Sequence, residues 1–233
     1  ATGPMNPQVP QGLVSNDLQG EASIGWQTAE YLGMTFGRAD VQAKLQKGVV
    51  NFAPLSIPVS SGKFVAQPQI LLNAQPPVAT LERGPLLDHV EISPELCRGW
   101  LMFVAPLVAN ATNAEGKFSV DMEGATVPLL DPIKCDVAGA FKIHNAKVGP
   151  GPTTAQLITM VKTLRGMTGD QPFDPASPDG KVWMQMGEQK VDFRVVDGRV
   201  HHRGMKFVMK DVEITTDGSV GFDETVEMVA NIP

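Results

Sequence analysis

Apolar residues occupy every second position through most of the stretch from Lys181 to Ile232. This period of two is that of a β-strand with one buried face. Asp197-Gly198 and Asp217-Gly218 interrupt the alternation, and Asp-Gly between alternating runs is a strong hairpin signal. The pattern predicts a meander of about five antiparallel strands, with one face rich in Met and Phe and the other charged.

Two further blocks of short alternating runs precede this meander, at residues 22–87 and 115–148. In the first block Val41, Ala43 and Leu45 alternate with polar residues. Several prolines interrupt this block, and proline cannot donate to a strand ladder. We therefore expect its strands to be short or to lie at a sheet edge.

Apolar residues also recur at helical spacing in two places, near residues 94–105 and near 154–165. Ser93 and Pro94 suit the N-cap and the first position of the first helix. The second helix ends before Gly166, a residue that favours helix termination. The sequence predicts two short amphipathic helices between the β blocks.

These elements predict a tail or linker at residues 1–20 and a single β-rich domain at 21–233, whose last β block is 181–232. Similar phrases recur, such as GKFVAQP at 62–68 and GKFSVDM at 116–122, which favours repeated units that extend one sheet. The expected fold is mainly β. It is a long, curved antiparallel sheet, a groove or half-barrel built from repeated β units, with the two short helices.

The composition is that of a folded protein, with 42% hydrophobic and 19% charged residues among 233. The net charge of −6 argues against nucleic acid as a partner, because phosphate binding needs clustered cations. The longest apolar run, 100–109, has about half the roughly 20 residues that span a bilayer. The first residues lack the pattern of a signal peptide. We expect a processed or excised piece of a longer protein.

Candidate chemistry is sparse. Cys97 and Cys135 both fall in apolar patterns, and we expect small core residues, with a disulfide as the alternative. His201 and His202 are adjacent on a strand, so they point to opposite faces and cannot chelate one metal ion; we expect them at the solvent or the rim. No catalytic or metal motif appears. The sequence predicts no enzyme, metal site or cofactor, and a hydrolase or carbohydrate-active β protein is the enzyme alternative.

The apolar face of the last meander is the candidate site, since Met is flexible and suits surfaces that accept varied apolar partners. Two interpretations stay open: an apolar groove that binds hydrocarbon, or a sheet packed on the helices with Met filling gaps. The groove candidates are Met184, Met186, Phe193, Met205, Phe207, Met209, Phe222 and Met228.

Two stretches resemble one known family. The segment FRVVDGRVHHRGMKFVMKDVEITTDGSVGFDETVEMVANIP at 193–233 resembles the C-terminal repeat of AsmA-like proteins, the TamB-related bacterial envelope proteins. The segment GRADVQAKLQKGVVNFAPLSIPVSSGKFVAQPQILL at 37–72 resembles an earlier unit of the same family. The resemblance implies a long curved sheet with a hydrophobic groove that holds or conducts lipids, and the family has no catalytic motif to carry over.

The resemblance also implies a location in the bacterial periplasm or cell envelope, and membrane association through an N-terminal anchor that this chain lacks. A lipid or another apolar molecule is the expected ligand. The alternative is a structural or protein-interaction β domain of an envelope protein, with a closed core and no ligand. The oligomeric state stays open.

Overall fold

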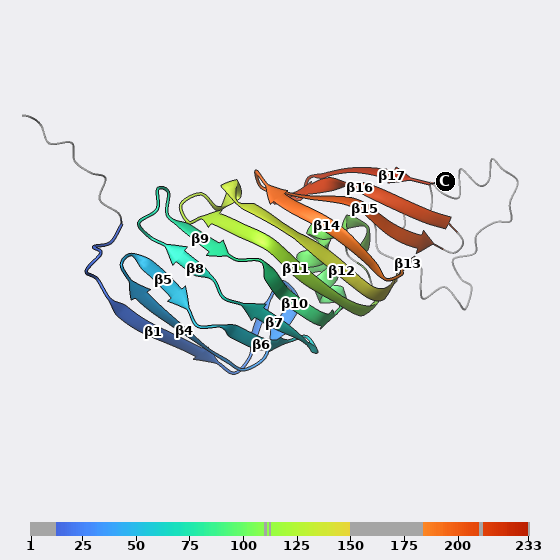
Figure 1. Cartoon of the computed structure of the whole chain (residues 1–233). Helices are drawn as coiled ribbons and strands as arrows, with labels where there is room; N and C mark the ends of the chain where they lie inside the picture. Colours follow the sequence, from blue (N-terminus) through green and yellow to red (C-terminus); the bar gives the residue numbers. More distant parts are fainter. Residues whose placement is uncertain (1–12, 110, 112, 150–183, 210–211, 233) are drawn as a thin grey trace, which may run out of the picture.

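The computed structural model describes residues 13–109, 111, 113–149, 184–209 and 212–232. The predicted mainly-β fold is confirmed: seventeen strands of the described residues belong to a single sheet. Figure 1 shows a long, curved sheet whose strands follow one another from the N-terminal to the C-terminal part of the chain. A short helical segment lies against one side of it.

The strands lie at the following positions: β1 (Gly20–Trp26), β2 (Ala29–Tyr31), β3 (Met34–Phe36), β4 (Ala39–Gln46), β5 (Val49–Phe52), β6 (Leu55–Val59), β7 (Gly62–Ala66), β8 (Gln69–Leu71), β9 (Val78–Leu81), β10 (Gly84–Glu91), β11 (Ala114–Pro128), β12 (Asp136–Val148), β13 (Met184–Met186), β14 (Gln189–Val196), β15 (Arg199–Met209), β16 (Val212–Gly221) and β17 (Val226–Asn231). The helical turns are α1 (Pro94–Leu96), η1 (Cys97–Leu101), α2 (Met102–Val104), η2 (Pro106–Val108) and η3 (Pro132–Lys134).

All strand pairs of the sheet are antiparallel. Its main path runs β1–β4–β5–β8–β9–β11–β12–β14–β15–β16–β17, and β10 lies between β7 and β11. Pro54 separates β5 from β6 and Pro68 separates β7 from β8, because proline has no N–H for the ladder. The strands around these prolines, β5 to β9, have three to five residues and are short, as predicted.

The first predicted helix is confirmed. The hydroxyl of Ser93 accepts from the N–H of Leu96 at 3.2 Å and caps it, and the chain stays helical to Val104. We call residues 94–108 the helical cover. The second predicted helix, at 154–165, lies outside the described residues, as do residues 1–12 of the predicted tail.

Of the two predicted hairpin turns, one is confirmed and one is wrong. Asp197 and Gly198 join β14 to β15 with φ of 49° and 70°, as this tight turn requires. Asp217 and Gly218 instead lie inside β16. A Cβ on Gly218 would clash with the carbonyl oxygen of Glu227 on β17, so the close approach of the two strands requires this glycine.

Candidate functional site

One face of the sheet is predominantly apolar. In the strand register Ile24 lies opposite Val41, and Ala43 lies opposite Phe52. Directly paired residues point to the same side of a sheet. The pairing continues in this way from β1 to β17 and joins the apolar positions of neighbouring strands into one surface, which we call the apolar face.

The helical cover closes the apolar face over the C-terminal half of the sheet. The Trp100 ring stacks on Phe118 with centroids 5.5 Å apart, and it also meets Phe141 at 5.8 Å. Phe118 is 0% exposed and Phe207, on β15, is 1% exposed. This half is therefore an ordinary close-packed core between helix and sheet.

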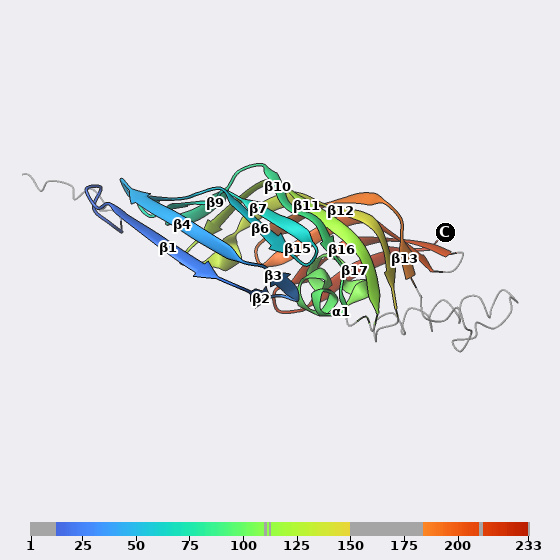
Figure 2. The same ribbon diagram turned by 90° about the horizontal axis from the view of Figure 1, so that it is seen from below.

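The N-terminal half of the apolar face has no such cover among the described residues. Figure 2 shows the helical cover beneath the middle and C-terminal strands, while β1 and β4 extend away from it. None of the apolar-face positions on β1, β4, β5, β8 and β9 is buried, and Ile24 is 64% exposed. We call these positions the open apolar face: Gly20, Ala22, Ile24, Trp26, Ala39, Val41, Ala43, Leu45, Val50, Phe52, Ile70, Ala79 and Leu81.

The open apolar face carries no ionisable side chain. Its one polar group is the indole N–H of Trp26, which is buried and has no hydrogen-bond partner. The opposite face of β1 and β4 is polar, and Lys44 pairs with Glu21 across these strands at 3.0 Å, whereas Val49, Leu71 and Val78 lie on that face of β5, β8 and β9. A surface of this kind can bind hydrocarbon by burial alone, without specific chemistry.

The structure places most of the sequence-predicted groove residues elsewhere, in the closed core. Phe222 is 48% exposed and touches the Phe103 ring of the helical cover, with centroids 6.2 Å apart, while Met228 is partly buried. The other candidates were predicted to line an open groove and are buried instead, because the helical cover packs on β15 and β16. The buried candidates, at most 9% exposed, are Met184, Met186, Phe193, Met205, Phe207 and Met209.

Both cysteines are buried and free, so the core interpretation holds for the described structure. Burial raises the pKa of the Cys97 thiol to about 11. A thiol with so high a pKa is largely protonated and unreactive at neutral pH.

The prediction that His201 and His202 face opposite ways is confirmed, and the prediction of a rim position is wrong for His202. His201 is exposed, whereas His202 is 5% exposed on the apolar face. Nε2 of His202 lies 3.3 Å from Oγ1 of Thr216, and Nδ1 has no partner. Burial lowers the pKa of His202; the charge of Asp217 opposes this shift in part, and His201 adds a smaller lowering effect.

A polar cluster on the opposite face brings together residues that are far apart in sequence. The rings of His89 and His144 stack in parallel with centroids 4.3 Å apart. Nδ1 of His89 lies 2.7 Å from Asp88, and Nε2 of His144 lies 2.8 Å from the hydroxyl of Ser119. Ser119 is 5% exposed and also accepts from the backbone N–H of His89, so it is held as a structural link rather than offered as a nucleophile.

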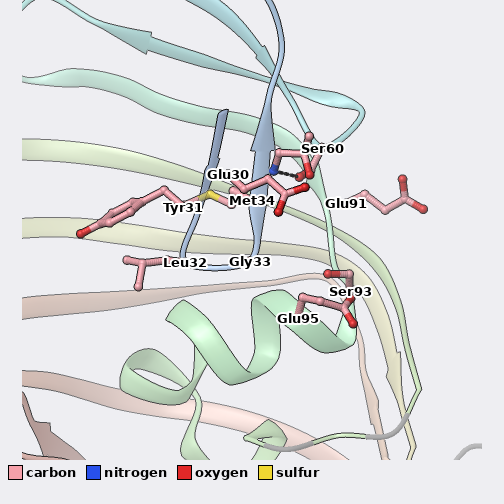
Figure 3. Close-up of a pocket in the computed structure, with 10 residues that line it drawn as sticks. Glu30, Tyr31, Leu32, Gly33, Met34, Ser60, Glu91, Ser93 and Glu95 are labelled. Atoms are coloured by element: carbon pink, nitrogen blue, oxygen red, sulfur yellow. Dashed lines mark hydrogen bonds between the residues drawn. The ribbon is translucent and has the colours of Figure 1, made fainter. Parts of the chain in front are cut away.

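A cavity of about 500 Å³ lies where the β2–β3 hairpin meets the start of the helical cover. Figure 3 shows Glu30, Glu91 and Glu95 around it. Hydrogen bonds from its own backbone N–H and from Ser93, together with the charge of Arg98, lower the pKa of Glu95. Among the described residues no three His, Cys, Asp or Glu side chains are arranged to hold a metal ion.

Within the described part of the chain, no helix has the length and apolar character that crossing a membrane requires. Comparison with family models, with curated proteins and with solved structures found no match.

Proposed function

We propose that this chain is a non-enzymatic module of the bacterial cell envelope that binds or conducts lipid acyl chains, as its resemblance to AsmA-like proteins implies. The observation that carries the proposal is the open apolar face. Every residue of this face is apolar, yet the structure buries these residues only in part. A large exposed apolar surface on a folded protein marks a binding site.

The dimensions suit an extended chain of methylene groups. Five strands, β1, β4, β5, β8 and β9, carry the open apolar face, and a strand spacing of about 4.8 Å gives it a width of roughly 19 Å. Each buried CH₂ contributes about 0.8 kcal/mol, so ten of them contribute about 8 kcal/mol before the cost of ordering. The uniform apolar lining favours acyl chains over ligands that require a specific polar partner.

A second candidate is a structural or protein-interaction domain. The closed core under the helical cover favours it, because the C-terminal half needs no ligand to be complete. Its β17 edge strand exposes Val226 and Val229 at 51% and 62%, and such an edge can pair with another strand. On this alternative the open apolar face binds protein instead of lipid.

The two faces of β4 supply a matched test. Ala43 lies on the open apolar face and Gln42, its neighbour, lies on the polar face. A charge at Ala43 would have to be desolvated by a bound chain, whereas the same charge at Gln42 stays in water. We expect Ala43→Glu to lower the affinity of delipidated protein for a fluorescent fatty acid at least tenfold, and Gln42→Glu to leave it unchanged. Equal affinities for the two variants would reject the proposed site, and no uptake by the unaltered protein would reject the proposed function.

A further inference from the structure

Exposed apolar side chains gather on loops that join neighbouring strands at one end of the strands. Leu129, Leu130 and Ile133 lie between β11 and β12 and are 38%, 74% and 59% exposed. Phe222, 48% exposed, lies between β16 and β17. We call these four residues the apolar rim. Large apolar side chains that are exposed together on loops are unusual and mark an interaction site.

The loops of the apolar rim are held close to one another. A Cβ on Gly198, in the β14–β15 turn, would lie 3.0 Å from Cγ2 of Ile133 and 3.8 Å from Cδ2 of Phe222. The N–H of Phe222 donates to the carbonyl of Gly198 at 2.8 Å. Ile133 and Phe222 therefore flank one turn.

Backbone hydrogen bonds also fix the loop between β11 and β12. The N–H of Leu129 donates to the carbonyl of Pro77 at 2.8 Å, and Cys135 closes the turn on Pro132 at 3.2 Å. The apolar rim is a preformed surface, so little conformational entropy is lost when a partner covers it.

The apolar rim is continuous with the apolar face behind it. Val127, Val137 and Val195 lie on that face directly inside the loops, and all three are only partly buried. Val127 pairs with Ala79, which belongs to the open apolar face. An apolar path therefore leads from the loops to the proposed acyl-chain site.

The charges around the apolar rim limit the kind of surface it fits. Lys134 is paired with Asp131 of its own loop at 3.0 Å, and Arg199 donates to Ser219 and Thr225. Exposed carboxylates at Asp197, Asp223 and Glu224 complete the surroundings, which leaves an acidic excess. Such a surface is repelled by anionic headgroups and tolerated by zwitterionic ones.

We propose that the apolar rim inserts into the interface of a zwitterionic lipid bilayer and that acyl chains pass there onto the apolar face. This inference rests on the proposed function, since it gives the acyl-chain site its route to a membrane. It commits to a bilayer rather than to a protein because the loops lead into the open apolar face, which carries no ionisable side chain.

The test compares binding to phosphatidylcholine vesicles with uptake of a monomeric fluorescent fatty acid. The variant is Leu130→Ser with Ile133→Ser, and the control is Val229→Ser, whose side chain is 62% exposed on β17. Loss of two inserted side chains is expected to weaken vesicle binding about a hundredfold. The control should bind vesicles normally, both proteins should take up the monomeric fatty acid normally, and phosphatidylglycerol in the vesicles should weaken binding.

Unchanged vesicle binding in the double variant would overturn the inference, as would a wild-type protein that does not bind the vesicles. A double variant that instead abolishes a concentration-dependent dimer would assign the apolar rim to a second copy of the chain and overturn it too. If vesicle binding depends on the apolar rim while no protein takes up monomeric fatty acid, the membrane contact stands and the proposed acyl-chain function fails.

Discussion

The same substitution at two phenylalanines of the apolar face should have very different effects on stability. Phe118 lies under the helical cover, is 0% exposed, and meets the rings of Trp100 and Phe141 at 5.5 and 5.1 Å. Phe52 belongs to the open apolar face, pairs with Ala43, and is only partly buried. Phe118→Ala and Phe52→Ala remove the same atoms from the same side of one sheet.

We expect Phe118→Ala to reduce the free energy of unfolding by about 3–5 kcal/mol, because it removes a fully buried ring and leaves a cavity. Phe52→Ala should reduce it by only about 1 kcal/mol, since the ring is only partly buried and its removal leaves no enclosed cavity. Urea denaturation of lipid-free protein, followed by circular dichroism, measures the free energy of unfolding of both variants. The dependence of this free energy on urea concentration should have the same slope for both. A destabilisation by Phe52→Ala as large as that by Phe118→Ala would refute the division of the apolar face into covered and open halves.

Three further predictions follow from the packing. Burial lowers the pKa of His202, so the unfolded chain binds a proton at this imidazole more readily than the folded protein does. The free energy of unfolding should therefore fall as pH drops below about 6.5, by at most about 1.4 kcal/mol per pH unit. His202→Phe should flatten this dependence in urea titrations at pH 7.5 and 5.5. Gly218→Ala should lower the free energy of unfolding by about 1–3 kcal/mol, because the added methyl group clashes with β17. Gly187→Ala should not lower it, because open space surrounds Gly187. Equal urea midpoints for the two variants would contradict this prediction. Cys97, with a thiol pKa of about 11, should resist alkylation at pH 8 in the native protein and react in urea, and rapid native labelling detected by mass spectrometry would contradict its burial.

The alternation of apolar and polar residues was sufficient to predict the sheet and its two faces, because that period is a local property of each strand. Ser93-Pro94 likewise marked the start of the helical cover through a local capping interaction. The turn predicted at Asp217-Gly218 was wrong because this glycine serves a tertiary contact rather than a local one. It accommodates the backbone of β17, a contact that turn chemistry does not encode.

The position of the open surface could not be read from alternation. Both halves of the sheet show the same pattern, as Val41 in β4 and Phe207 in β15 illustrate, and only the tertiary packing of the helical cover separates them. The open face was predicted where Met and Phe are most frequent, but these large residues form the core instead. His89 and His144 were missed as a pair because the register of β10, β11 and β12 brings them together.

The most direct measurement of the central claim is photo-crosslinking of a bound acyl chain from two adjacent positions of β4. A benzophenone side chain introduced at Ala43 would lie on the open apolar face, and the same group at Gln42 would lie on the polar face. With palmitic acid present, we predict a lipid adduct of the Ala43 variant and none of the Gln42 variant by intact mass spectrometry. Adducts at both positions, or none at Ala43, would contradict the account.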